Sequence, residues 1–391
     1  MDFSFSADEQ AYQAEVRAFL ERELTPERRR ERLDYNDQSW SDETLDREFR
    51  QALTQSGLMG YSLPLEYGGR GKPGAYNAIL SYEMARARAP GVYHSVYIIG
   101  PSLMAFGSED QRRHFLPRIA RGEVEFCLGY SEPGAGSDLA NLATRATADG
   151  DDFVITGQKS FTTAAHRVEY CWMVARTNPD VPKHKGVSLF IVPMDAPGVT
   201  VRPMWTVPGW QHNEVFFDRV RVPKSALVGE RDHGWYHLMT ALDFERSGFL
   251  YYGEAQRLLD ELLDYCRITW RDGRPLSRDP RVRQKLARLR IEMDTGLRMV
   301  KRIIWMQSRG EVPSVEASVN KVWATDMLQR ICRFGTEIMG LAGTLMPSSP
   351  YVFRQGQLAY GYLETLRSTV SIGANETQRN ILAQRGLNMP R

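Results

Sequence analysis

The 391-residue sequence predicts a multidomain α+β protein in which a β-rich region separates two helical regions. Apolar residues recur at helical spacing up to about residue 121. Short segments rich in β-branched and aromatic residues follow, separated by Gly, Pro, Asn and Asp. Long amphipathic patterns then return. These changes place the domain boundaries at 1–121, 122–232 and 233–391.

The N-terminal region carries clear helix start and stop signals. Ser6 followed by Glu9 forms a capping-box pattern, which predicts a helix through about Leu24. Three more helices are expected in ETLDREFRQALTQSGLMG, which should end at Gly60, in YNAILSYEMARARA and in EDQRRHFLPRIARGE.

The central region predicts an all-β insert of short strands. The segments are FCLGYS, DFVITG, YCWMVART, GVSLFIVP, VTVRPMWT and EVFFDRVRVP. DGDD at 149–152 is typical of a tight turn. Beyond it, helices are expected from about Trp235, with breaks at RDGRPLSRDP and MPSSP.

Composition and charge exclude several classes of function. The net charge of +2 gives no field that favours nucleic acid. No secretory signal begins the chain, and no run approaches the roughly 18 apolar residues of a membrane span. We therefore expect a soluble, cytoplasmic protein.

Neither the cysteines nor the histidines predict a metal site. The four cysteines form no C-x-x-C pair and are expected to be buried thiols. His233 and His237 have helical ligand spacing, but Gly234 weakens the helix and no H-E-x-x-H pattern occurs. Motifs of Rossmann and P-loop nucleotide sites are missing from the sequence as well.

Two segments carry candidate chemistry. LGYSEPGAGSDLANLATRAT, residues 128–147, follows a predicted strand, and its glycines let the backbone approach a ligand closely. Successive N–H groups there can hold an anion or a polarised carbonyl, although a plain loop has the same composition. LDFER, residues 242–246, places charged side chains in an apolar run, where a carboxylate is paired, exposed or reactive.

Read together with GQKSFTT (157–163) and NETQRNILAQR (375–385), these segments resemble the acyl-CoA dehydrogenase family. The resemblance covers nearly the whole chain, and YSEPGAGSD is its most specific part. Within the family, FTTAAHRVEYCWMVARTNPDVPKHKGVSLFIV is similar to actinobacterial enzymes that act on steroid side-chain CoA thioesters. The resemblance implies a helical N-terminal domain, a β-barrel-like or sandwich domain facing a flavin, and a C-terminal four-helix bundle.

The family also implies a reaction. An acyl-CoA thioester loses its α-proton to a base and its β-hydride to FAD, and the electrons pass to an electron-transferring flavoprotein. The positions that match flavin contacts are Leu128, Tyr130, Ser131, Gly136, Ser137, Phe161, Thr163, Ala374, Asn375 and Glu376. Phe161 replaces a frequent Trp, and Thr163 matches a Thr near the reactive flavin nitrogen. Ser137, Asp243 and Arg246 match positions that contact the CoA arm.

The position of the base departs from the commonest family pattern. Aligning on Gln378 puts Ile372 where many members carry the catalytic Glu, and isoleucine cannot accept a proton. Other branches carry the base directly before an Arg on the helix that opens the C-terminal domain. Glu245, followed by Arg246, matches that position and is the predicted base. The alternative, a Glu–Arg pair that only pins the helix, is disfavoured because adjacent helical residues point about 100° apart.

Two further departures concern the flavin contacts that the family implies. Asp272 stands where the family motif R-x-x-F-G has Phe. Glu337 and Leu341 replace a Gln and a Gly of another stretch. Steroid-type relatives with similar changes form α2β2 heterotetramers, so the chain is predicted to be a homo- or hetero-oligomer, dimer or tetramer. Three readings stay open: a self-sufficient dehydrogenase, a related flavoenzyme acting on carrier-protein thioesters, and a subunit supporting a catalytic sibling.

Overall fold

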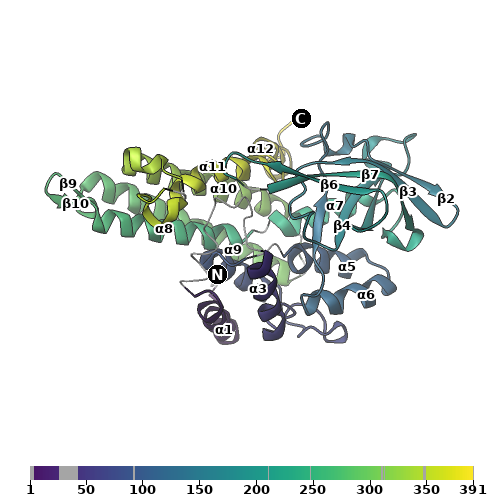
Figure 1. The fold of residues 1–391 in the computed structure, drawn as a ribbon, viewed down its shortest axis with the longest axis horizontal. Helices are drawn as coiled ribbons and strands as arrows, with labels where there is room; N and C mark the ends of the chain where they lie inside the picture. The colour runs from purple at the N-terminus through teal and green to yellow at the C-terminus, as the bar shows by residue number, and fades with distance from the viewer. Residues whose placement is uncertain are drawn as a thin grey trace. The chain divides into compact units, whose positions relative to one another are not determined.

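The computed structural model describes residues 4–25, 43–90, 93–209, 211–246, 248–309, 311, 313–346 and 349–390. The side chains at 43–47, 243–246 and 355 lie outside this description. Two compact units are found. One comprises Met1–Phe49, Pro73–Pro90 and Arg246–Arg391, and the other Arg50–Lys72 and Gly91–Glu245 (Figure 1).

The first unit is helical, and its helices begin and end at local signals. Helix α1 (Ala7–Glu23) starts at Ser6, whose hydroxyl accepts from the Glu9 N–H while Glu9 accepts from the Ser6 N–H, which confirms the predicted capping box. Helix α3 (Glu43–Ser56) ends earlier than expected. Gly57 follows it with φ +68°, so the prediction of an end at Gly60 was wrong because the left-handed residue comes three positions sooner.

The long C-terminal helices are α8 (Leu250–Ile268), α9 (Pro280–Ser308), α10 (Ser314–Met339) and α11 (Gln357–Val370), followed by the short α12 (Asn375–Ile381). Helix α10 contacts each of the others, and α8 also packs on α4 (Ala75–Ala87). A Cβ on Gly253 would lie 2.2 Å from the carbonyl oxygen of Tyr82, so glycine permits this close approach. The predicted breaks fall between α8 and α9 and after α10.

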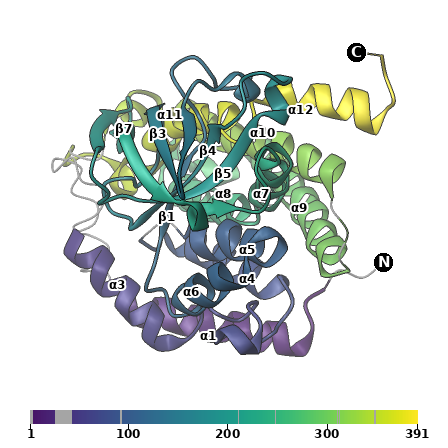
Figure 2. The same cartoon turned by 90° about the vertical axis from the view of Figure 1, so that its right-hand side faces the viewer.

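The second unit is built around an eight-stranded sheet, with α5 (Gly100–Phe106) and α6 (Glu109–Ala120) preceding it along the chain. The strand order is β6-β7-β3-β2-β4-β5-β8, and β1 pairs in parallel with β4. Figure 2 shows β4 and β5 side by side. The strand bounds are Phe126–Gly129 (β1), Arg145–Asp149 (β2), Asp152–Lys159 (β3), Tyr170–Arg176 (β4), Val187–Pro193 (β5), Val199–Trp205 (β6), Gln211–Pro223 (β7) and Leu227–Val228 (β8).

Burial along these strands follows their position in the sheet. Strand β4 is buried at five consecutive residues from Cys171 to Ala175, as expected of a central strand with both faces covered. Strand β6 is mostly exposed and carries Pro203, which suits an edge. The predicted DGDD turn is confirmed, because β2 and β3 meet at Asp149 and Asp152 and Gly150 has φ +62°.

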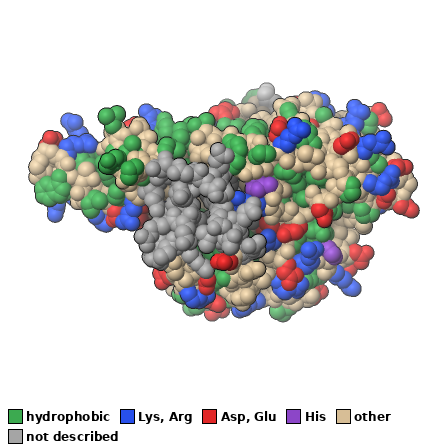
Figure 3. All heavy atoms as spheres, in the orientation of Figure 1, with side chains coloured by type: hydrophobic (Ala, Val, Ile, Leu, Met, Phe, Trp, Pro, Cys, Tyr) green, Lys and Arg blue, Asp and Glu red, His purple; other side chains and the backbone are tan. Residues whose placement is uncertain are grey.

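The surface is mixed in charge. Lys and Arg side chains alternate with Asp and Glu over the described face in Figure 3, in keeping with the small net charge. The four cysteines are buried and free. None of the described helices is long and apolar enough to cross a membrane, and the described His, Cys, Asp and Glu residues form no group of three that could hold a metal ion.

Glu125, immediately before β1, is a buried acid with a pKa near neutrality. Its carboxylate accepts hydrogen bonds from the N–H and hydroxyl of Ser95 at 2.7 and 2.6 Å and from the Phe126 N–H at 2.9 Å. Burial raises the pKa of Glu125 to about 7, and these hydrogen bonds only partly oppose it. The neighbouring His94, held by the Phe126 carbonyl, has its pKa lowered by burial to about 4.

Glu125→Gln is therefore expected to change the pH dependence of stability. Since the folded-state pKa of Glu125 is raised, its contribution is complete below about pH 4.5 and is lost as the pH rises towards 7. Glutamine does not ionise, so at pH 8 the free energy of unfolding of the variant should exceed that of the wild type by about 3 kcal/mol. At pH 4.5 the two proteins should have the same free energy of unfolding. Urea unfolding at both pH values provides the measurement. Both proteins keep His94, whose titration cancels in the comparison. Parallel stability curves between pH 4.5 and 8 would contradict this assignment.

Candidate functional site

A buried ion pair fixes the glycine-rich segment to β3. The Lys159 ammonium lies 2.7 Å from Oε1 of Glu132, and the side chains are 0% and 5% exposed. Lys159 also donates to the Tyr130 carbonyl at 3.3 Å. Glu132 accepts from the N–H groups of Ala143 and Thr144 at 2.6 and 3.1 Å. The pair thus joins the segment after β1, the end of β3 and the start of β2.

Burial and pairing act against each other on the two pKa values. Burial lowers the pKa of Lys159, and the Glu132 charge opposes this. Burial also acts to raise the pKa of Glu132, but the Lys159 charge and the hydrogen bonds outweigh it, so the net shift is downward. Each charge thus offsets part of the cost of burying the other. Both residues lie in motifs named above, but the sequence does not predict their pairing, because the two positions are 27 residues apart.

The glycines of this segment face open space. A Cβ on Gly134 or Gly136 would meet no heavy atom within 4 Å, and both residues are exposed. Ala135 between them is buried and exchanges backbone hydrogen bonds with Glu132. Packing within the chain therefore does not require glycine at these two positions. Exposed backbone at Gly136 and Ser137 remains accessible to a ligand.

The other predicted flavin contacts of this region lie beside it. Leu128 is on β1, where it pairs with Trp172, and Tyr130 is buried. The Ser131 carbonyl accepts from the Ser160 N–H at 2.9 Å. This bond connects the glycine-rich segment to the turn after β3, which carries Phe161 and Thr163. The structure thus brings all seven predicted contacts between 128 and 163 onto two adjoining segments.

The turn after β3 holds Phe161 in an unusual position. Phe161 has φ +55° and is 62% exposed, although bulky residues rarely adopt a left-handed conformation. The Thr163 hydroxyl lies 3.1 Å from Nδ1 of His212, and the Phe161 ring meets the same imidazole edge-on. Asn213 fixes the turn, because its Nδ2 donates to the Thr162 carbonyl at 2.9 Å while its own carbonyl accepts from the Thr162 N–H.

Two hydroxyl groups of this turn suit a further ligand. The side-chain oxygens of Ser160 and Thr162 are buried and have no hydrogen-bond partner among the described residues. Unpaired buried hydroxyls are costly and are commonly satisfied by a ligand or water. Beside them, the exposed Phe161 ring and the open glycines are accessible to a flat ligand.

The predicted base lies on α7 (Gly234–Arg246). The backbone at Asp243, Glu245 and Arg246 belongs to this helix, whereas their side chains lie outside the described residues. Leu238, Ala241 and Leu242 are buried, and position 245 falls on the same helical face by its i+3, i+4 and i+7 spacing. That face is where burial of a carboxylate would increase its basicity.

His237 on α7 and His233 just before it both have partners within the chain. His237 stacks on Phe106, and burial lowers the pKa of its imidazole. His233 lies 3.0 Å from the Glu230 carboxylate.

The remaining predicted contacts belong to the helical unit. Ala374 is the N-cap of α12, and Glu376 is exposed in its first turn. Asn375, by contrast, is buried, and its side-chain amide bonds to residues of α10. The side chain of Asn375 is therefore used within the helical unit. Ile372, at the position of the common family base, has φ +58°.

The structure gives local reasons for two departures from the family pattern. Asp272 and Gly273 have φ of +50° and +75° in the turn between the short strands β9 (Trp270–Arg271) and β10 (Arg274–Pro275). Asp-Gly is a preferred sequence for such a hairpin turn, whereas Phe is not. Glu337 forms an exposed ion pair with Arg333, and Leu341 is 90% exposed.

Comparison with known proteins agrees with the resemblance seen in the sequence. The acyl-CoA dehydrogenase N-terminal, middle and C-terminal domain models match residues 6–123, 127–220 and 232–387. The chain is 38% identical over 355 residues to acyl-CoA dehydrogenase IpdE1 of Mycobacterium tuberculosis, covering 88% of each protein. It is 33% identical to acyl-CoA dehydrogenase FadE26 of the same organism, covering 100% of this chain and 99% of FadE26.

Solved structures share the whole fold. A steroid acyl-CoA dehydrogenase, Tcur3481-Tcur3483, is 35% identical with a TM-score of 0.90 over 100% of both chains. The ChsE4-ChsE5 complex from Mycobacterium tuberculosis is 33% identical with a TM-score of 0.88 over 100% of both chains. The α–β–α fold class predicted from the sequence is confirmed. The chain belongs to the acyl-CoA dehydrogenase family.

Proposed function

We propose that this acyl-CoA dehydrogenase holds FAD and introduces a double bond between the α and β carbons of an acyl-CoA thioester. The observation that carries the proposal is the accessible surface formed by Gly136, Ser137, Phe161 and Thr163, held in place by the buried Glu132–Lys159 pair. FAD, when bound, supplies the acceptor for the β-hydride.

Residues of the chain abstract the α-proton, bind the CoA arm and exclude water. The Glu245 carboxylate takes the α-proton as the Cα–H bond breaks, and the electron pair left on Cα forms the Cα–Cβ double bond while hydride leaves Cβ. Asp243, Arg246 and Ser137 hold the CoA arm, which places the α-carbon against the base. Exclusion of water by the buried face of α7 keeps the carboxylate basic. An electron-transferring flavoprotein would then take both electrons.

The first experiment is the visible absorption spectrum of the purified full chain, with flavin quantified per subunit. About one FAD per chain, bleached by an acyl-CoA that is a substrate, is the expected result. Gly136→Val supplies the structural control. A valine side chain at position 136 would meet open space, so the free energy of unfolding should change little. The affinity for flavin should fall if this backbone contacts the cofactor. A flavin-binding wild type with an equally tight Gly136→Val variant would remove Gly136 from the site.

A second candidate is a subunit of a heteromeric acyl-CoA dehydrogenase with a shared FAD site. Asp272, Glu337 and Leu341 favour it, since a carboxylate near a phosphate is repulsive and a Leu blocks close backbone approach. The two-part names Tcur3481-Tcur3483 and ChsE4-ChsE5 belong to two of the similar structures. Little flavin on the chain alone, restored by co-expression with a sibling chain, would support this candidate. A carrier-protein thioester in place of CoA is distinguished by assaying both substrates.

A further inference from the structure

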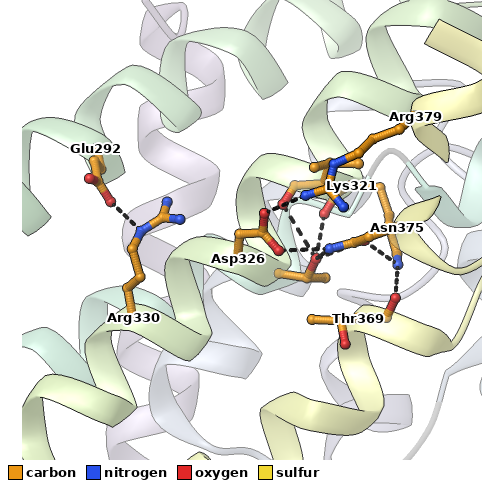
Figure 4. Close-up of polar contacts among 9 residues, drawn as sticks. Glu292, Lys321, Asp326, Arg330, Thr369, Asn375 and Arg379 are labelled. Atoms are coloured by element: carbon orange, nitrogen blue, oxygen red, sulfur yellow. Dashed lines mark hydrogen bonds and ion pairs between the residues drawn. The ribbon is translucent and has the colours of Figure 1, made fainter. Parts of the chain in front are cut away.

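Lys321 is a buried lysine at the centre of a polar cluster in the helical unit. It lies on α10 and is 0% exposed. Its ammonium donates to Oδ1 of Asn375 at 2.7 Å and to the Thr369 carbonyl at 3.1 Å (Figure 4). Thr369 is in the last turn of α11, and Asn375 is the first residue of α12. One ammonium group thus holds both ends of the four-residue turn 371–374.

The donors and acceptors of the cluster fix how Asn375 is oriented. Lys321 can only donate, so it must face the amide oxygen of Asn375. The Asp326 carboxylate can only accept, and it receives Nδ2 of Asn375 at 2.7 Å. The other oxygen of Asp326 accepts from Arg379, one turn along α12, at 3.0 Å. The first turn of α12 is therefore attached to α10 at two points.

The turn held by Lys321 contains a strained residue. Ile372 has φ +58°, and Gly373 after it has φ +86°. A left-handed conformation suits glycine, but in a β-branched residue it is an outlier that persists only where the surrounding structure imposes it. The two hydrogen bonds of Lys321 lie on either side of this residue, on elements that the turn connects.

We infer that Lys321 is a positioning residue that imposes the left-handed turn at Ile372–Gly373 and so presents the backbone of Ala374 and Glu376 to the cofactor. The inference rests on the proposed function for the cofactor, but its structural part concerns this chain alone. Removing the ammonium would release the Thr369 end of the turn and would leave the Asn375 end held only by Thr325 and Asp326. The strain at Ile372 would then favour a different backbone conformation.

Lys321→Met in the full chain tests this, because methionine keeps most of the side-chain length and removes the donors. Amide hydrogen exchange at 371–377, measured without flavin, is expected to become about tenfold faster or more, the loss expected for hydrogen bonds from a charged group. The dissociation constant for added FAD is expected to rise by a similar factor. Adding Ile372→Gly to Lys321→Met should recover part of both losses, because glycine adopts the turn without strain.

Two variants that remove other contacts of α10 serve as controls. Tyr252→Phe removes a buried hydrogen bond of 2.7 Å to Asn320, the neighbour of Lys321 on α10. Arg330→Gln breaks the exposed ion pair with Glu292 that is also drawn in Figure 4. Neither should change exchange at 371–377. A similar effect from Tyr252→Phe, unchanged exchange in Lys321→Met, or no recovery by Ile372→Gly would each overturn the inference.

The readouts separate this inference from the proposed function. A wild-type chain that binds no FAD, alone or with a sibling, would refute the proposed function, while the exchange data would still decide the role of Lys321. Should Lys321→Met fail to fold, Ile372→Gly alone is the second test. Exchange at 371–377 that is equal or slower in this variant supports an imposed, strained turn, and faster exchange shows that the Ile372 side chain itself holds the turn.

Discussion

Glu245→Gln is expected to leave the fold and the flavin content unchanged and to reduce turnover of an acyl-CoA substrate by about 10²–10⁴-fold, the contribution typical of a positioned general base. Glutamine has nearly the same shape as glutamate but cannot accept the α-proton. Ile372 occupies the other position at which the family carries its base, and isoleucine cannot accept the proton in place of Glu245. Steady-state kinetics with the flavin-replete enzyme and an electron-transferring flavoprotein or an artificial acceptor provides the measurement.

Two further variants test the assignment of Glu245 as the base. Glu245→Asp keeps a base but withdraws it by about one methylene, so partial activity is expected because misplacement by about 1 Å is costly. Glu230→Gln removes an exposed carboxylate that pairs with His233 just before α7, and its turnover should match that of the wild type. Near wild-type activity in Glu245→Gln would place the base elsewhere in the chain or on a partner.

Lys159→Met is expected to destabilise the sheet unit by about 3–5 kcal/mol, because it leaves the Glu132 carboxylate buried without its counter-charge. Native-state hydrogen exchange of β3 and β4 amides measures this local loss without requiring the two units to unfold together. Flavin affinity should fall with it, since Glu132 and Lys159 hold both segments that carry the proposed contacts.

The matching double variant and an exposed control make this prediction specific. Lys159→Met combined with Glu132→Gln should recover much of the loss, because a neutral amide costs less to bury than a carboxylate. Lys224→Met breaks an exposed ion pair with Asp151 in the same unit and should have little measurable effect. A change as small as that of Lys224→Met would show that the Glu132–Lys159 pair does not hold the sheet unit together.

The sequence predicted local structure correctly where neighbouring residues determine the backbone conformation. The capping box of Ser6 and Glu9 and the turn at Gly150 both depend on residues within three positions of each other. Strand β2, by contrast, was not assigned. It reads as polar RATAD and buries only Ala146 along its length, so it gave no alternating apolar pattern.

For the proposed site too, the sequence predicted some features and not others. Motif resemblance identified Gly136, Ser137, Phe161 and Thr163 by position, and their exposure or hydrogen bonds fit that proposal. Asn375 was selected from the same kind of evidence, yet its side chain is used by α10. A motif identifies the residue, but it does not say which way the side chain of that residue points.

For this protein, the sequence alone determined the order of helical and β-rich regions and the family, because periodicity and short motifs are properties of neighbouring residues. Only the tertiary structure revealed the Glu132–Lys159 pair and the Lys321–Asn375 contact, whose members are 27 and 54 residues apart. The physical reason is burial. An ammonium group withdrawn from water must find its acceptors among whatever elements the fold brings to it, and those elements are distant in the chain.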